Sequence, residues 1–257
     1  MFKKLGLHLL ILAALLAASL PGAQAAPPAQ STNLLVNGGF ESTGGGAGTA
    51  SWTPWWAEIQ KPADGSFNYA YRPTWNAESL SNAAAPALIL AGSTSQRIIN
   101  NWDPWWAGVR QVVNAPAGAR VRLTAYARVW ASAGNWPNPS DITVGTSNRV
   151  GIDPNGSDNQ FASTVVWSGS LNPHDAWQPV SVEATVGASG KVGVFLSSDY
   201  RGSSRLFLSA YWDEASLVVV SAGNTPPPGA TNPPGATSPP AAITPFVLPT
   251  PGPDGNI

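Results

Sequence analysis

Cysteine is absent from the 257 residues, and only one histidine, His174, follows residue 25. A disulfide framework, a thiolate zinc site and a cysteine nucleophile are therefore excluded, and one histidine leaves no material for a multi-histidine metal site. Charged residues make up only 11% of the chain. Without Lys3 and Lys4, 11 basic residues face 14 acidic ones, so no basic surplus remains to replace the counterions of a nucleic acid.

The two ends of the chain predict segments outside the folded domain. Residues 1–25 combine Lys3 and Lys4 with an apolar run and a small-residue cleavage pattern, which is typical of a signal peptide and indicates a secreted or cell-surface protein. Residues 26–32 then form a short linker. Residues 221–257 are rich in proline and poor in large apolar groups, so we expect a disordered tail. No later apolar run is long enough to cross a membrane.

Residues 33–220 are predicted to form one all-β domain. From Val121 to Val129, every second residue is apolar, and the same period of two recurs in residues 180–186 and 192–196. Clusters of Gly, Pro, Asn and Ser separate roughly ten such segments, and no helical period extends beyond about three turns. This pattern predicts an antiparallel β-sandwich of two sheets, of the jelly-roll type.

One short sequence occurs twice. Residues 52–57 read Trp-Thr-Pro-Trp-Trp-Ala, and residues 102–107 read Trp-Asp-Pro-Trp-Trp-Ala. The flanking residues do not match, so we interpret the pair as two similar local loops rather than as a duplicated fold.

Four stretches resemble carbohydrate-binding modules of the family 4/9/22 type, which have a galactose-binding-like jelly-roll fold. The domain opens with Asn-Leu-Leu-Val-Asn-Gly-Gly-Phe-Glu at 33–41 and closes with Tyr-Trp-Asp-Glu-Ala-Ser-Leu at 211–217. Between them, residues 111–127 are similar to the family's strand, turn and central strand, and residues 176–180 to its later strand that begins with Trp. Residues 67–101 depart from the family pattern.

The resemblance implies a structural calcium ion where the first and last strands meet. Its ligands would be the carbonyl of Gly39 and the carboxylates of Glu41 and Asp213. A hard cation takes six to eight oxygen ligands, and it would relieve the repulsion between two carboxylates at the chain ends. Alternatively, Glu41 is simply exposed and Asp213 caps a turn.

The tryptophans are the candidate ligand-binding residues, because a flat indole can stack on the apolar face of a sugar ring. One candidate group, Trp55, Trp105 and Trp106, lies in proline-containing loops in which all the rings cannot easily be buried. The second group lies on the central strand. If every second residue from Val121 to Val129 faces the core, then Tyr126, Arg128 and Trp130 face outward, onto either a groove or a convex surface. Gln111 is a further polar candidate.

These observations predict a secreted, non-catalytic domain that binds polysaccharide. No pair of Asp or Glu residues stands in a recognisable catalytic sequence, so we predict no enzyme. One alternative is an extracellular surface or matrix protein whose tryptophans contact other proteins or copies of itself, and a glycoside hydrolase is a third possibility.

Overall fold

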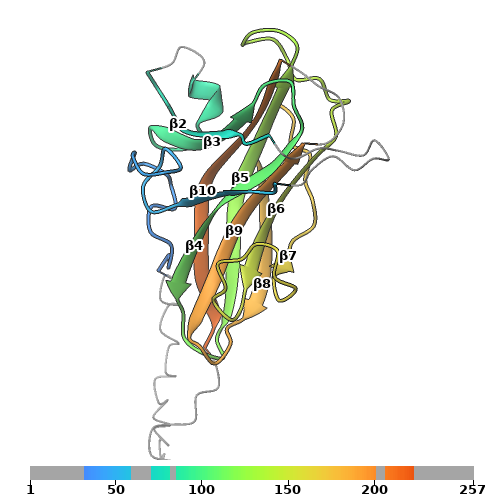
Figure 1. Ribbon diagram of the computed structural model, residues 1–257. Helices are drawn as coiled ribbons and strands as arrows, with labels where there is room; N and C mark the ends of the chain where they lie inside the picture. Colours follow the sequence, from blue (N-terminus) through green and yellow to red (C-terminus); the bar gives the residue numbers. More distant parts are fainter. Residues whose placement is uncertain (1–31, 59–70, 82–84, 201–205, 223–257) are drawn as a thin grey trace, which may run out of the picture. The chain divides into compact units, whose positions relative to one another are not determined.

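The computed structural model describes residues 32–58, 71–81, 85–200 and 206–222 (Figure 1). The predicted signal peptide, nearly all of the linker and nearly all of the tail lie outside the described residues. Within those residues, no helix has the length and apolar character needed to span a membrane. The elements are β1 (Thr53–Trp56), β2 (Thr74–Ser79), the 3₁₀ helix η1 (Ala85–Leu88), β3 (Thr94–Asn100), β4 (Trp105–Asn114), β5 (Arg120–Ser132), β6 (Thr146–Asp153), β7 (Val166–Trp167), β8 (Gln178–Thr185), β9 (Lys191–Tyr200) and β10 (Phe207–Ser221).

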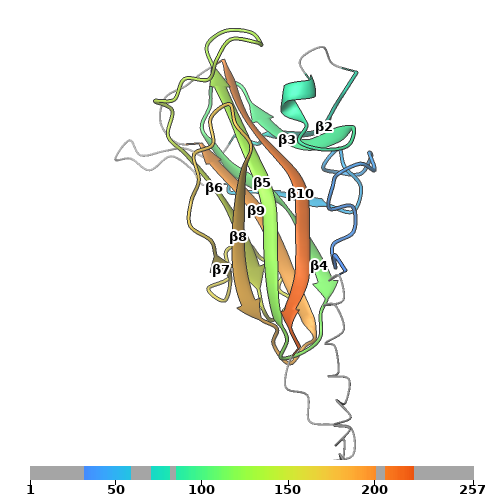
Figure 2. The ribbon, with the colours of Figure 1, turned by 180° about the vertical axis from the view of Figure 1, so that it is seen from behind.

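The strands form two five-stranded sheets. Sheet I has the order β1-β4-β9-β6-β7, and sheet II has the order β2-β3-β10-β5-β8. All strand pairs within the sheets are antiparallel. Figure 1 views the domain with β4, β9 and β6 toward the reader, and Figure 2, seen from behind, brings β8, β5 and β10 forward. The predicted two-sheet β-sandwich of the jelly-roll type is confirmed.

The core lies between the sheets, where the predicted alternation places it. From Val121 to Val129, every second side chain of β5 is fully buried. Val150 and Ile152 of β6 belong to the same buried cluster, together with Val194 of β9. Full burial of one Val, Leu or Ile side chain contributes about 1.5–3 kcal/mol, so a core of this size needs no crosslink.

The two similar segments, residues 52–57 and 102–107, contribute to neighbouring strands: residues 53–56 form β1 and residues 105–107 begin β4, which corrects their interpretation as two local loops. Trp55 of β1 pairs with Gly108 of β4, and Trp56 pairs with Ala107. Since side chains of a strand alternate between its two faces, adjacent tryptophans point to opposite sides of the sheet. Trp105 therefore enters the core while Trp106 faces outward.

The first and last parts of the domain are joined by hydrogen bonds, as the resemblance implied. Asn33 is the centre of this junction: its Oδ1 accepts the N–H of Leu217 at 2.9 Å, and its Nδ2 donates to the carbonyl of Ala215 at 3.0 Å. Gly38 is required here, because a Cβ atom at this position would lie 2.1 Å from the Ala215 carbonyl oxygen. Gly38 of the opening Asn-Gly-Gly motif is thus required by the packing of this segment against β10.

Glu183 lies on the outer face of β8 and forms ion pairs with two arginines of β5. Its carboxylate accepts hydrogen bonds from Arg120 and Arg122 of β5 at 2.5 and 2.7 Å, and these bonds hold the pKa of Glu183 below its ordinary value of 4.5. A lowered folded-state pKa stabilises the fold above the unfolded pKa, and this contribution is lost as the pH falls through the folded pKa.

We therefore expect Glu183→Gln to weaken the loss of thermal stability between about pH 5 and pH 3 relative to wild type. Unfolding midpoints measured by circular dichroism at a series of pH values check this. Glu58→Gln, which removes an exposed carboxylate elsewhere, is the control. If the unfolding midpoints of wild type and Glu183→Gln fall equally with pH, the contribution of the Glu183 ion pairs to stability is contradicted.

Candidate functional site

The outer face of sheet I gathers aromatic rings and one arginine. Because Trp105 and Val109 of β4 lie in the core, Trp106 points outward, and in the same way Val150 and Ile152 of β6 leave Arg149 outward. We call this surface the aromatic face, and its members come from β1, β4, β6, β7 and the loop before β7: Trp55, Trp106, Arg149, Phe161 and Trp167.

Two glycines allow rings of the aromatic face to pack directly against the sheet backbone. A Cβ atom on Gly108 would lie 2.6 Å from the ring of Trp55, and one on Gly151 would lie 2.7 Å from the ring of Trp167. Both distances are shorter than any real contact, so the rings rest directly on the backbone of β4 and β6. The missing side chains let both rings lie close against the sheet.

Arg149 lies between two indoles. Its Cζ atom is 4.3 Å from the ring centre of Trp167 and 5.9 Å from that of Trp106. Such contacts hold a guanidinium group by cation–π attraction, which at exposed sites contributes about 0.5–1 kcal/mol. All three side chains are partly exposed. The indole N–H of Trp106 donates to Ser197 Oγ at 3.0 Å, which fixes the orientation of that ring.

Phe161 is the most exposed member of the aromatic face, with half of its surface accessible. Its ring meets Trp106 edge-on at 5.3 Å and Trp55 at 6.0 Å. Arg110 of β4 holds the loop that carries Phe161, because it donates to the carbonyl of Asp158 and to Gln160 Oε1. The loop thus covers Trp55 and leaves Phe161 at the surface.

The structure divides the first group of predicted binding residues. Trp105 is fully buried in the core and Trp55 is only 3% exposed. All three residues lie in strands β1 and β4, so the expectation that they lie in loops is wrong. Trp106 remains partly exposed on the aromatic face, and its contact with ligand stays a prediction. The side-chain amide of Gln111 forms two hydrogen bonds with the backbone of Val36: its oxygen accepts the Val36 N–H, and its nitrogen donates to the Val36 carbonyl.

The predicted platform on β5 is covered by the chain itself. Trp130 is 3% exposed, and its ring stacks on Phe207 at 5.0 Å while Trp136 meets it edge-on. Its indole N–H donates to the carbonyl of Asn138 at 2.9 Å. Trp130 lies on the outer face of sheet II, as the alternation of β5 predicts. The loop after β5 returns over this face, so Trp130 offers no open stacking surface.

The two other predicted residues of β5 differ in their surroundings. Arg128 is 7% exposed, donates to the carbonyl of Asp175 and lies 3.6 Å from its carboxylate. Burial lowers the pKa of the Arg128 guanidinium, and the Asp175 charge acts in the opposite direction. Tyr126 is half-buried and lies opposite Asp213 in the strand register. Ligand binding by these two residues stays a prediction.

The predicted calcium ligands bind backbone N–H groups of a single loop. The Glu41 carboxylate accepts the N–H and O–H of Ser93 and the N–H of Thr94. Asp213 Oδ2 accepts the N–H groups of Leu90 and Ala91. Burial raises the pKa of Glu41, but the bonds from Ser93 and Thr94 outweigh it and hold that pKa below its ordinary value.

These hydrogen bonds occupy oxygen positions that calcium would need. A carboxylate has about four lone-pair positions, and three donors, the N–H and O–H of Ser93 and the N–H of Thr94, bind that of Glu41. Gly39 lies beside the side chains of Glu41 and Glu214. No group of three or more Asp, Glu, His or Cys side chains within the described residues could hold a metal ion. Calcium at Gly39, Glu41 and Asp213 stays a prediction without support from these contacts.

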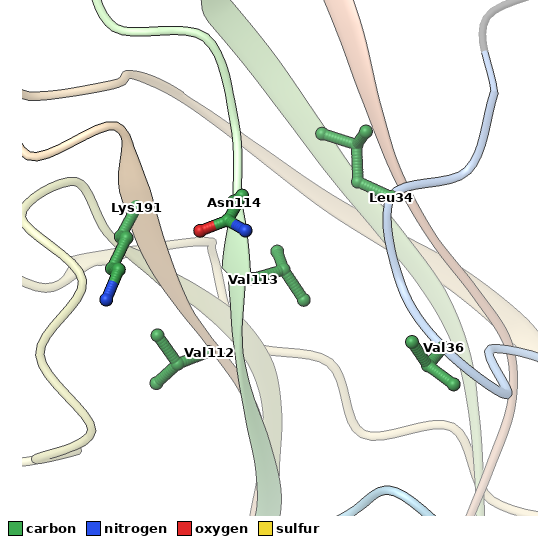
Figure 3. A pocket seen from close by; sticks show the side chains of 6 residues that line it. All are labelled: Leu34, Val36, Val112, Val113, Asn114 and Lys191. Carbon is green, nitrogen blue, oxygen red and sulfur yellow. The ribbon is translucent and has the colours of Figure 1, made fainter.

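A hollow lies at the end of β4 formed by Val112, Val113 and Asn114. It has a volume of about 420 Å³, and Figure 3 shows the side chains of Leu34, Val36, Val112, Val113, Asn114 and Lys191 around it. Four of these six are aliphatic, so the hollow offers few groups that could orient a polar ligand.

Comparison with known proteins gives no match to any family model and none to any curated protein. Carbohydrate-binding modules are among the solved structures that are similar. TmCBM61, in complex with β-1,4-galactotriose, is 13% identical with a TM-score of 0.46, over 74% of this chain and 99% of that chain. The CBM22-1 xylan-binding domain of Xyn10C from Paenibacillus barcinonensis is 13% identical with a TM-score of 0.40, over 75% and 97%.

An enzyme is also among the similar structures. A Stig cyclase from Fischerella sp. TAU is 12% identical with a TM-score of 0.44, over 75% of this chain and 99% of that chain. Likeness at this level says nothing about what the present chain binds or catalyses.

The buried position of Trp130 predicts a large loss of stability on truncation. We expect Trp130→Ala to reduce the free energy of unfolding by about 3–5 kcal/mol, because the variant removes a buried indole and leaves a cavity. Chemical denaturation monitored by fluorescence measures this. Trp102→Ala, which truncates a tryptophan that is 53% exposed, is the matched control and should change stability little. Equal stability of Trp130→Ala and wild type would contradict the burial.

The contacts of Glu41 and Asp213 predict a domain whose stability does not depend on calcium. We expect the unfolding midpoint in EDTA to equal that in millimolar calcium, since N–H groups already bind both carboxylates. Differential scanning calorimetry of wild type and Asp213→Asn checks this. A lower midpoint in EDTA for wild type, absent from Asp213→Asn, would instead establish calcium at this place.

Proposed function

We propose that this chain is a secreted, non-catalytic module that binds polysaccharide on the aromatic face of sheet I. The observation that carries the proposal is the placement of Arg149 between Trp106 and Trp167, with the half-exposed Phe161 beside them. The predicted signal peptide at residues 1–25 supports secretion.

This arrangement matches the chemistry of a sugar ring. A pyranose presents an apolar face of C–H groups with hydroxyl groups around its edge, so a binding site combines aromatic rings with fixed hydrogen-bond donors. Trp167 and Phe161 supply partly exposed rings, and Arg149 carries a rigid set of N–H donors. Because the two indoles hold the guanidinium group, binding a sugar hydroxyl immobilises little additional side chain.

The carboxylates of the aromatic face support the non-catalytic part of the proposal. Glycoside hydrolysis generally needs two carboxylates on either side of the bond to be cleaved. Asp199, which lies beside Trp106 in the strand register, is 4% exposed, and the carboxylate of Asp158 lies 3.4 Å from Arg110. The carboxylate of Asp158 is thus paired with Arg110, and that of Asp199 is buried.

A protein-contact function is the second candidate, and the ring geometry favours it in one respect. The rings of Trp55, Trp106 and Phe161 meet at 80–82° rather than forming a continuous coplanar strip. Edge-to-face clusters of this kind also occur in protein interfaces, where Trp, Phe and Arg are enriched. Sedimentation velocity over a hundredfold concentration range distinguishes self-association from a monomer that binds polysaccharide.

The test of polysaccharide binding uses exposed members of the aromatic face. We expect retention on at least one of cellulose, xylan, β-1,4-galactan and mannan, measured by affinity electrophoresis or pull-down. Phe161→Ala and Trp167→Ala should each weaken binding about tenfold, since stacking contributes on the order of 1 kcal/mol per ring. Arg149→Lys should also weaken binding, because it keeps the charge and loses the planar donors.

Ile142→Ala is the control, since Ile142 is a highly exposed apolar residue outside the aromatic face. It should bind as wild type does. Retention of Phe161→Ala and Trp167→Ala equal to that of wild type would reject the aromatic face as the binding surface.

A further inference from the structure

A small hollow lies beside the edge strand β2, away from the aromatic face. Its volume is about 320 Å³, close to the lower limit of about 300 Å³ for ligand sites, and it is lined by Gly46, Arg72, Pro73, Thr74 and Trp75. Arg72 and Thr74 are exposed, whereas Pro73 and Trp75 are buried. The hollow therefore offers an accessible cation and an accessible hydroxyl group beside buried apolar rings.

Two tryptophans, one from each edge strand, meet at this side of the sandwich. β1 is the edge of sheet I and β2 is the edge of sheet II. The ring centres of Trp56 and Trp75 are 6.4 Å apart, with an angle of 60° between the ring planes. The orientation of Trp75 is fixed, because its indole N–H donates to the Gly108 carbonyl of β4 at 3.0 Å. Trp56 packs against the core and stays partly exposed.

The guanidinium group of Arg72 lies over both of these rings. Its Cζ atom is 4.8 Å from the ring centre of Trp56 and 5.7 Å from that of Trp75. Cation–π attraction of this kind restricts the guanidinium group but leaves the N–H groups at its edge available for hydrogen bonds. A ligand oxygen at Arg72 would thus meet donors whose orientation is already limited.

Arg72 differs from most other arginines in its partners. Within the described residues, its guanidinium group contacts indole rings but neither a carboxylate nor a hydrogen-bond acceptor. The charge of Arg72 is therefore not compensated by that part of the chain, and an anion can bind it without displacing an internal partner. Five arginines do form ion pairs with carboxylates: Arg97 with Glu78, Arg110 with Asp158, Arg120 and Arg122 with Glu183, and Arg128 with Asp175.

The geometry points to a binding site at Arg72 for a sugar that carries a carboxylate, that is, a hexuronic acid. A planar guanidinium group binds a carboxylate through two parallel N–H···O bonds. Pro73 and Trp75 offer apolar contact to the C–H groups of the sugar, and the hydroxyl group of Thr74 can donate to it. A neutral sugar gains nothing from the charge of Arg72, so we expect the site to prefer uronic acids. This inference goes beyond the proposed function, because it concerns another surface and a charged sugar.

NMR titration of the ¹⁵N-labelled full-length protein tests this site. The Arg72 Nε–H and Trp56 indole N–H signals are followed with glucuronate and galacturonate, with glucose and galactose as matched neutral sugars, and with inorganic phosphate and sulfate as other oxyanions. We expect a saturable shift with at least one uronate and none with the neutral sugars at the same concentrations. Added salt should weaken the uronate shift, because the contact is ionic and exposed.

Arginine variants show whether Arg72 makes the contact. In Arg72→Gln, the uronate affinity measured from the Trp56 signal should fall about tenfold, and Arg72→Lys should also weaken it, because lysine keeps the charge without the planar pair of donors. Arg72 is exposed, so neither substitution opens a cavity. Arg122→Gln is the matched control, since it removes an exposed arginine that is already paired with Glu183, and it should bind uronate as wild type does.

Four results would each overturn the site. They are no shift with either uronate, equal shifts with uronates and neutral sugars, shifts with phosphate or sulfate alone, and unchanged uronate binding by Arg72→Gln.

A Phe161→Ala/Trp167→Ala variant separates this site from the aromatic face. We expect it to lose retention on neutral polysaccharides while it keeps the uronate shift at Arg72. Loss of that shift in this variant would place uronate binding on the aromatic face and would overturn the site at Arg72. Retention of wild type on neutral polysaccharides without a uronate shift rejects only this inference, whereas a uronate shift without retention rejects only the aromatic face.

Discussion

The hydrogen bonds of strand β10 are the constraint on which the rest of the domain depends. β10 lies between β3 and β5 in sheet II, and its residues Ala215 and Leu217 also bind the opening segment through Asn33. Its bulge after Asp213 turns that carboxylate toward the loop that leads into β3. One strand therefore fixes the position of the chain's first segment, the edge of sheet II and the loop around Glu41.

The two outer faces of the sandwich differ because different loops return over them. On sheet II, Trp136 and Phe207 cover Trp130, and Leu88 of η1 packs in the same small cluster as Tyr211. On sheet I, the loop before β7 covers Trp55 but leaves Phe161 and Arg149 accessible. The same alternating pattern thus produces a second buried cluster on one side and a partly open surface on the other. Beyond that cluster, polar residues of sheet II such as Arg122 of β5 and Ser181 of β8 are exposed.

The fold could be predicted from the sequence, because period-two alternation fixes which side chains of β5 face the core. The site could not be predicted in the same way. Alternation places Trp130 on the outer face, but it cannot show that a loop near Trp136 folds back over that face. Arg149 follows the same rule through Val150 and Ile152, and would have been found by it. Phe161 lies in a loop, where no period exists, and its position depends on Arg110, about fifty residues earlier. The prolines of residues 52–57 and 102–107 predict loops, although Pro54 lies on an edge strand, where proline is tolerated.

The junction between Asn33 and β10 also determines how the domain would bear a mechanical load. If the module links a surface to a polysaccharide, tension reaches it through the segments that flank residues 33 and 221. The first and last described residues of the domain meet at β10, where the Leu34 N–H donates to the Leu217 carbonyl at 2.8 Å. Tension between them would act on this small group of hydrogen bonds first, ahead of the long β5–β10 ladder. The opening segment could therefore peel away as an extensible tether while the sandwich stays folded.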